Sequence, residues 1–295
     1  MHKSSLFFLV ILGCCLSITA QAGSLASLFA PKAELWAVWQ THNESSTAKI
    51  DHQAWDAFLS RNVVTGKDGI NRIAYASVSA ADKHALADYI SRMQHIAISQ
   101  YSRAQQKAYW ANLYNAETVN VVLQHYPVKS IRDIDISPGF FSDGPWGKKL
   151  LNIENRKVSL NDIEHRILRP VWHDNRLHYA LNCASLGCPN LQKHAFWPDT
   201  MDTVLEQAAK DYINHPRGAR FKEGGLYVSS IYNWFQGDFG GSDAGVIAHL
   251  KKYAGEKLAA RLAKVSKISG DDYNWALNDA SPVQSTAQPG SDELQ

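Results

Sequence analysis

The chain has 295 residues, and its 30 lysines and arginines against 28 acidic residues leave a formal net charge of +2. This near-neutral balance, without a cluster of five or more basic residues, offers no field to attract nucleic acid, so we expect no nucleic-acid partner. Only Cys183 and Cys188 lie beyond residue 15. A chain of this length can bury a large core, so folding should not depend on disulfides.

Residues 1–22 are typical of a secretory signal peptide. An apolar run from Leu6 to about Ile18 precedes Ala20-Gln21-Ala22, whose small side chains suit signal peptidase. We therefore predict a mature chain that begins near Gly23, is periplasmic or secreted, and has no transmembrane segment. An alternative interpretation takes Ile11 to Cys14 as a lipoprotein box, which would anchor the chain through a lipidated Cys14.

The first half of the folded part is predicted to be helical. Asp51 and Ser79 can each cap a helix, and a third helix should run from Ser102 to about His125, before Pro127. The third segment, AYWANLYNAETVNVVLQHY, is apolar on nearly every face, so it should be buried on most sides. These three helices should pack together.

The second half mixes short strands with helices. KLLNIENRKVSL predicts a hairpin turning at Glu154-Asn155, and ARFKEGGLYVSS predicts another turning at Gly224-Gly225. RLHYALN is interpreted as a strand that runs into the cysteine loop. We expect a helix through Ile163 and Ile167 that ends before Pro170, and further helices over 201–213, 243–253 and 255–264.

The predicted class is α+β, with a helical N-terminal half packed on a small antiparallel sheet built from short hairpins. Strands cluster along the chain instead of alternating regularly with helices, and no long linker separates the halves. We therefore predict one domain over 23–278. The residues 279–295 are rich in Ser, Pro, Gln and Asp, which predicts a disordered tail.

Two amides interrupt the apolar third helix. Asn112 and Asn115 are three residues apart, so their side chains should lie side by side. A buried amide needs hydrogen-bond partners, or it destabilises the fold by about 1 to 3 kcal/mol. They either brace neighbouring backbone or form one wall of a pocket.

The segment LNDIEHRILRP places Asp162, His165 and Arg169 on one helix face, with Glu164 beside the inward stripe. Glu164 or His165 could act as a general base if it faces a cleft. The alternative is an ordinary solvated helix face that ends in an arginine.

The stretch HYALNCASLGCPNL leaves four interpretations of its two cysteines open. An oxidising compartment would allow a disulfide between Cys183 and Cys188, closing a short loop. Cys183 could instead be a working thiol activated by a neighbouring histidine or cation. Zinc bound by His178, both cysteines and His194 matches no common spacing, and two ordinary buried thiols remain possible.

Three motifs in order, YWANLYNAETVNVV, SLNDIEHRILRP and HYALNCASLGCPNL, resemble the family called domain of unknown function 547, over about residues 95–235. The resemblance implies that the polar groups of these motifs converge in space, and it implies no particular reaction. The family pattern falls here on Trp110, Asn112, Tyr114, Asn115, Ile163, Glu164, Arg169, His178, Cys183, Cys188 and Pro189.

The leading hypothesis is a thiol hydrolase or acyltransferase that acts on a peptide or cell-envelope component. Cys183 would attack, His178 or His165 would be the base, and Asn112 or Asn115 would orient the imidazole or an oxyanion. No cofactor or metal is expected. The alternative is a non-catalytic envelope binding or assembly module around a Cys183–Cys188 disulfide. In the hypothesis, the substrate-binding residues are Trp110, Tyr114, Arg169 and Ser185.

Overall fold

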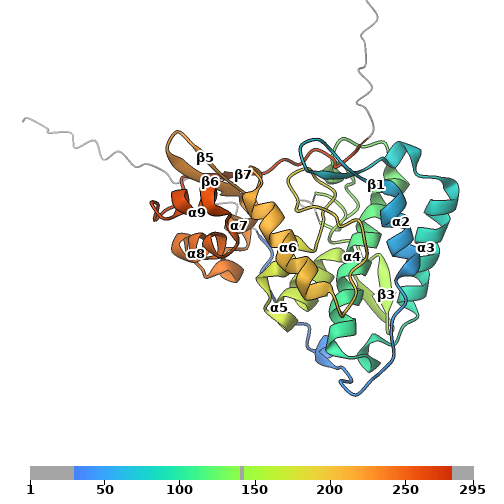
Figure 1. The fold of residues 1–295 in the computed structure, drawn as a ribbon. Coiled ribbons are helices and arrows are strands. Elements are labelled where there is room, and N and C mark those ends of the chain that lie inside the picture. The colour runs from blue at the N-terminus through green and yellow to red at the C-terminus, as the bar shows by residue number, and fades with distance from the viewer. Residues whose placement is uncertain (1–29, 140–142, 281–295) are drawn as a thin grey trace, which may run out of the picture.

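The computed structural model describes residues 30–139 and 143–280 (Figure 1). The predicted signal peptide, Cys14 and residues 281–295 lie outside the described part. Asp279, where the predicted tail begins, is still attached to the fold. Its carboxylate accepts a hydrogen bond of 2.8 Å from the Tyr126 hydroxyl, and its backbone forms a parallel bridge with Ile73.

Helices and small sheets alternate along the described chain, which confirms the α+β class. The α-helices are α2 (Gln53–Asn62), α3 (Ala80–Gln94), α4 (Arg103–His125), α5 (Arg169–Trp172), α6 (Met201–Asn214), α7 (Ser230–Trp234), α8 (Asp243–Tyr253) and α9 (Glu256–Leu262). The shorter helical turns are η1 (Ala37–Gln40), η2 (Tyr75–Ser77), η3 (Ile98–Gln100), η4 (Ile131–Asp133), η5 (Asp162–Leu168), η6 (Asn175–Tyr179) and η7 (Gln236–Phe239). The strands are β1 (Val63–Thr65), β2 (Asn71–Ile73), β3 (Leu151–Ile153), β4 (Arg156–Val158), β5 (Ala219–Lys222), β6 (Gly225–Ser229) and β7 (Gly270–Asp272).

Helix α4 is the centre of the larger core. Every residue from Ala108 to Val119 is buried, as its nearly continuous apolar sequence predicts. In Figure 1, α2 and α3 lie on one side of α4, and α6 lies on the other. The predicted caps hold for two helices, because Ser79 and Ser102 accept hydrogen bonds from the first turns of α3 and α4. Helix α2 begins later, at Gln53, whose N–H donates to Asp51.

Both predicted hairpins are present. β3 and β4 turn at Glu154 and Asn155, whose φ angles of 47° and 62° are left-handed, as a two-residue turn of this kind requires. β5 and β6 turn at Glu223 and Gly224, one residue earlier than expected, so that Gly225 is already in the strand. The sheets are separate and small, and one further hairpin pairs β1 with β2. The third sheet gains β7, parallel to β6.

The strand predicted for RLHYALN is wrong, because this segment forms the 3-10 turn η6. Asp174 caps the turn by accepting a hydrogen bond from Arg176 N–H at 3.0 Å, and Lys107 of α4 holds the same carboxylate at 2.8 Å. These anchors favour a helical start, and the segment has no β-branched residue to oppose it. His178 therefore lies on a helical turn instead of a strand.

The helix expected to end before Pro170 continues past it to Trp172. The segment Asp162–Leu168 is a π-helical turn, in which Arg169 N–H bonds to Glu164 C=O, five residues earlier. Pro170 then falls in the first turn of α5, where its missing N–H leaves no unmade helix bond. His173, with φ of 49°, ends the helix.

The C-terminal elements form a second hydrophobic cluster. Buried side chains of α6, β5, β6 and α8 pack there, and the larger cluster surrounds α4. Figure 1 shows β5, β6, α8 and α9 at one end of the molecule and α2 and α3 at the other. Of the residues of η6, Leu177 belongs to the first cluster and Tyr179 to the second, so η6 joins the two. Over the described residues, no helix has the length and apolarity needed to cross a membrane.

Candidate functional site

A cavity of about 660 Å³ lies where the three sequence motifs meet. Tyr114 comes from α4, Glu164 and His165 come from η5, and His178 comes from η6. The loop after η6 adds both cysteines, and α7 and the chain beyond β7 add aromatic side chains. The volume is within the range of small-molecule sites.

The thiol cluster occupies one wall. The Cys183 backbone N–H donates a hydrogen bond of 2.9 Å to Cys188 Sγ. The Tyr273 hydroxyl lies 3.0 Å from Cys188 Sγ and 3.1 Å from Cys183 Sγ. Ser185 Oγ lies 3.3 Å from Cys183 Sγ and 3.0 Å from the Tyr273 hydroxyl. Both cysteines are free thiols, with Cys188 buried and Cys183 half-buried.

These donors favour a thiolate at Cys188. Burial alone would raise the pKa of the Cys188 thiol, but hydrogen bonds from the Cys183 thiol, the Tyr273 hydroxyl and the Cys183 N–H lower it to about 7. Burial and the neighbouring sulfur of Cys188 raise the pKa of the Cys183 thiol. The sequence points to Cys183 as the activated sulfur, whereas the hydrogen-bond donors in the structure surround Cys188. Because Ala184 has a φ of 58° and no helix begins there, a helix N-terminus contributes nothing to this ionisation.

An acid–base wall faces the same cavity. His178 Nε2 lies 2.7 Å from Asp238 Oδ2, and Arg169 Nε donates to the same oxygen at 2.6 Å. Burial opposes the charge of Asp238, but these two partners hold its pKa well below the ordinary value. Arg169 also donates to His165 Nδ1 at 2.9 Å. Burial lowers the pKa of His165 to about 4, so this imidazole is neutral and keeps its proton on Nε2.

Glu164 and Tyr114 connect the two walls. Glu164 Oε1 lies 3.9 Å from Nδ1 of both His165 and His178. Tyr114 and Glu164 line the same cavity. Burial raises the pKa of Tyr114 most, and the charges of Glu164 and both cysteines raise it further. The pKa of Tyr114 therefore depends on the charge of Glu164 and on the charges of both thiols.

The remaining wall is aromatic. Trp234 stacks on Trp275 with ring centroids 5.6 Å apart, and Tyr273 packs against Trp234 and Trp275 at 4.9 and 4.7 Å. Phe235 stacks on the His178 imidazole at 4.7 Å. A ligand here meets flat apolar surfaces on the side that also carries the thiols.

Asn112 and Asn115 lie outside this cavity. Asn112 exchanges two hydrogen bonds with the Phe196 backbone, at 2.8 and 2.9 Å. Asn115 donates to Ala180 C=O and accepts from Asn182 N–H, at 2.8 and 2.9 Å. They brace backbone, so the role of orienting an imidazole or an oxyanion is not supported for either. Trp110, expected in the binding site, is instead in the core, where it packs against Trp39 and Tyr109.

Asp162 also departs from the expected face. Its carboxylate accepts hydrogen bonds from the Ser159 N–H and hydroxyl, both at 2.8 Å, and forms an ion pair with Lys149. It therefore anchors the start of η5, away from the contact between His165 and Arg169.

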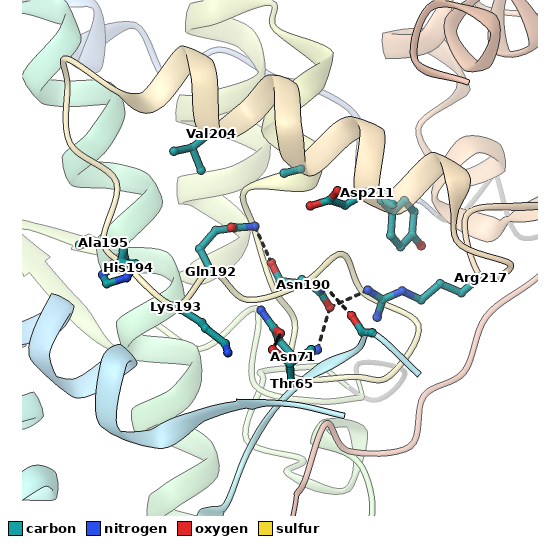
Figure 2. Close-up of a pocket in the computed structure, with 13 residues that line it drawn as sticks. Thr65, Asn71, Asn190, Gln192, Lys193, His194, Ala195, Val204, Asp211 and Arg217 are labelled. Atoms are coloured by element: carbon teal, nitrogen blue, oxygen red, sulfur yellow. Dashed lines mark hydrogen bonds between the residues drawn. The ribbon is translucent and has the colours of Figure 1, made fainter. Parts of the chain in front are cut away.

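The four residues of the zinc alternative do not converge. His178, Cys183 and Cys188 line the cavity described above, but His194 lines a separate pocket (Figure 2). There His194 Nδ1 lies 3.3 Å from the Asp56 carboxylate. In the described part of the chain, no group of three or more His, Cys, Asp or Glu side chains is arranged to hold a metal ion.

Two residues of this site did not stand out in the sequence. Asp238 contacts His178 from 60 positions away, and Tyr273 contacts Cys183 from 90 positions away. Both lie beyond the three motifs, on η7 and just after β7. Asp238 lies in WFQGDF and Tyr273 in DDYNW, where acidic and aromatic residues stand close together. Such stretches are too common for the sequence alone to mark Asp238 or Tyr273 as a site residue.

Comparison with known proteins gives one match. Residues 98–213 match the model of the family described as "Protein of unknown function, DUF547". The searches of curated proteins and of solved structures found no match. The matched segment carries α4, η5, η6 and both cysteines, which confirms the resemblance seen in the sequence. Residues 98–213 of the chain are therefore similar to the DUF547 family.

Proposed function

We propose that the protein is an enzyme that uses its thiol pair for acyl transfer or hydrolysis. One observation carries this proposal: both thiols, the acid–base residues Glu164, His165 and His178, and Tyr114 line a single cavity. A nucleophilic thiol needs a lowered pKa, and the Cys183 N–H and the Tyr273 hydroxyl both donate hydrogen bonds to Cys188 Sγ.

In the proposed reaction, the thiolate of the pair attacks the carbonyl carbon of an ester or amide, and the carbonyl electron pair moves to oxygen. Collapse of this intermediate re-forms the carbonyl, breaks the bond to the leaving group and leaves a thioester. His178, held by Asp238 at 2.7 Å, gives the leaving group its proton. Water or another nucleophile then releases the acyl group and restores the thiolate, and the proton it loses returns to His178.

The substrate class follows from the cavity and from the predicted export of the chain. Aromatic surfaces and a cavity of about 660 Å³ suit a peptide or an acylated envelope component. We propose the extracytoplasmic location on the N-terminal sequence alone. In an oxidising compartment the contacting thiols could also join, and this favours the second candidate, a binding module around a structural disulfide.

The test uses the purified full chain and p-nitrophenyl acetate as an acyl donor. We expect release of nitrophenolate and an acetyl adduct on the thiol pair, seen by mass spectrometry. The rate of acetyl transfer should rise as the pH passes about 7, because the Cys188 thiol ionises there. Cys188→Ser should abolish the adduct, because the remaining Cys183 has a raised pKa.

Tyr273→Phe provides a graded variant, because it removes one hydrogen bond to Cys188 and leaves the aromatic ring. The midpoint of its pH profile should move to higher pH, while Tyr227→Phe on β6 should leave the profile unchanged. No adduct in the reduced wild-type protein would contradict acyl chemistry. A purified chain without titratable thiols, and with equal stability losses in Cys183→Ser and Cys188→Ser, would favour the disulfide module.

A further inference from the structure

A second pocket, of about 480 Å³, lies behind the cysteine loop. Figure 2 shows it between the β1–β2 hairpin, the segment around Asn190 and helix α6. Asn190 belongs to the same loop that carries Cys183 and Cys188 into the first cavity. No described residue lines both this second pocket and the cavity of the proposed active site.

Arg217 is a cation that forms no ion pair with a carboxylate of residues 30–139 or 143–280. One of its terminal nitrogens donates to Leu186 C=O at 3.1 Å, and the other donates to Asn190 Oδ1 at 2.7 Å. Its Nε is buried and has no hydrogen-bond partner in the described structure. A guanidinium has five N–H groups, so neutral oxygens satisfy only part of it. Burial lowers the pKa of Arg217, as expected for a cation that lacks a counter-ion.

Lys193 is the second cation of the pocket. It is exposed, and no carboxylate of the described residues lies within ion-pair distance of it. In Figure 2, Lys193 and Arg217 approach Asn71 and Asn190 from opposite sides. Among the described residues that line the pocket, one is acidic: Asp211. Its side chain is exposed and accepts a hydrogen bond from Gln207.

Between the two cations the pocket is lined by neutral hydrogen-bonding groups. The Asn190 amide accepts a hydrogen bond from the Asn71 backbone N–H and donates to Gly69 C=O, and the Asn71 amide donates to Leu191 C=O. Each amide has two N–H groups and two lone pairs, so each keeps capacity for a ligand. The Thr65 hydroxyl donates to Asn71 and keeps its lone pairs. Gln192 donates to Asn190 C=O at 3.1 Å and also lines the pocket.

We propose that this pocket binds a small hydroxylated molecule that carries one phosphate or carboxylate group, such as a sugar phosphate or a sugar acid. Arg217 and Lys193 bind the anionic group, and the amides of Asn71, Asn190 and Gln192 bind hydroxyl groups. A bond between the guanidinium and an anionic oxygen, in which both partners are charged, is stronger than the bonds that Arg217 now makes to neutral oxygens. The site stands apart from the acyl chemistry proposed above and does not depend on it.

The experiment is isothermal titration of the full chain, at low and constant ionic strength, with three probes: glucose 6-phosphate, glucuronate and glucose. We expect at least one anionic sugar to bind and glucose to bind about tenfold more weakly or not at all. The result also shows whether phosphate or carboxylate is the preferred group. Added sodium chloride should weaken the binding.

Lys193→Gln should weaken binding of the anionic probe about tenfold, and it should fold normally because the side chain is exposed. Arg217→Gln should weaken binding at least as much, with circular dichroism to verify folding. Lys251→Gln, an exposed lysine on α8, is the matched control and should bind like the wild type. The proposal is overturned if neither anionic sugar binds, if glucose binds as tightly, or if Lys193→Gln leaves the affinity unchanged.

Discussion

At the scale of single residues, the polar side chains on α4 decide how the cysteine loop is held. Asn115 is 2% exposed and uses both ends of its amide on the backbone of Ala180 and Asn182. Asn182 in turn donates to Pro189 C=O at 2.8 Å. One amide on a central helix thus fixes the start of the loop, and that loop closes on itself around the two thiols.

Asn115→Leu is therefore expected to destabilise the fold although it adds apolar volume. The change leaves the Ala180 carbonyl and the Asn182 N–H buried without partners, and each unmade bond costs about 1 to 3 kcal/mol. A lower urea midpoint with an unchanged slope would show this loss. Gln124→Leu, at an exposed position of the same helix, is the control and should keep the wild-type midpoint. An unchanged midpoint for Asn115→Leu would contradict the bracing role.

The sequence predicted these amides because a polar group on an apolar helix stands out. It could not decide between bracing and a pocket wall, since that depends on which distant backbone lies opposite. The same limit applies to the thiols. Their spacing is local, but the ionisation of Cys188 depends on Tyr273, which approaches from 85 positions away. Local patterns predict which residues matter, and tertiary contacts decide what they do.

At the scale of elements, long periodic helices and tight turns were predictable, and short irregular turns were not. α3 and α4 follow their caps and apolar patterns, and the β3–β4 turn follows from Glu154-Asn155. η5 departs from expectation because a π-helical turn accommodates Pro170 without losing the helix. η6 departs because a cap at Asp174, held by Lys107 of α4, outweighs the alternating pattern of RLHYALN. Both exceptions lie at the candidate site.

Helix α4 also buries a carboxyl group with a weak partner. Glu117 is 5% exposed, and Asn120 donates to it at 3.3 Å. Burial raises its pKa from 4.5 to about 7, although the bond from Asn120 opposes this. A raised pKa in the folded state means that the folded protein holds this proton more tightly. The stability that protonated Glu117 contributes is fully present below about pH 4.5 and is lost as the pH rises through about 7.

Glu117→Gln should therefore stabilise the protein at alkaline pH and have little effect at acidic pH. The neutral amide still accepts the bond from Asn120, and it removes a buried charge worth up to roughly 3 kcal/mol above about pH 8. Urea unfolding at about pH 5 and about pH 8 measures both values. Glu256→Gln, at an exposed site in α9, should give no such difference. A variant that is equally stabilised, or not stabilised, at both values would contradict the buried ionisation.

At the scale of the whole molecule, the C-terminal segment around Asn278 packs beside Ile73, an early residue of the described chain, and beside the cysteine loop. Asn278 N–H bonds to Ala184 C=O at 3.0 Å, and its carbonyl accepts from Ile73 N–H at 2.9 Å. β7 pairs parallel to β6, and the segment after it brings Tyr273 to the thiols. The α+β class was predictable from the clustering of patterns. This packing was not, because no local signal specifies a pairing across some 200 residues.

Buried histidines spread over both hydrophobic clusters make the whole fold sensitive to acid. Burial lowers the pKa of His52, His165 and His249 from 6.5 to about 4. All three are 9% exposed or less. A lowered pKa in the folded state means that the unfolded chain takes up these protons first. The stability they contribute is complete above about 6.5 and is lost as the pH falls toward about 4.

Each histidine corresponds to roughly 3 kcal/mol, and Glu117 opposes one of them over the same range. After the opposing contribution of Glu117 is subtracted, the free energy of unfolding lost through the three histidines is comparable to the total stability of a typical domain, about 5 to 15 kcal/mol. We therefore expect the urea midpoint to fall steeply between about pH 6.5 and pH 4.5, and the protein to unfold without denaturant near pH 4. His52→Phe keeps the aromatic packing on Trp197 and removes one group that takes up a proton on unfolding. The urea midpoint of this variant should therefore fall less steeply with decreasing pH.

The urea midpoint of His84→Phe, at an exposed site on α3, should fall as steeply as that of the wild type. A wild-type midpoint that stays constant from pH 7 to pH 5 would show that these imidazoles are not held neutral by burial.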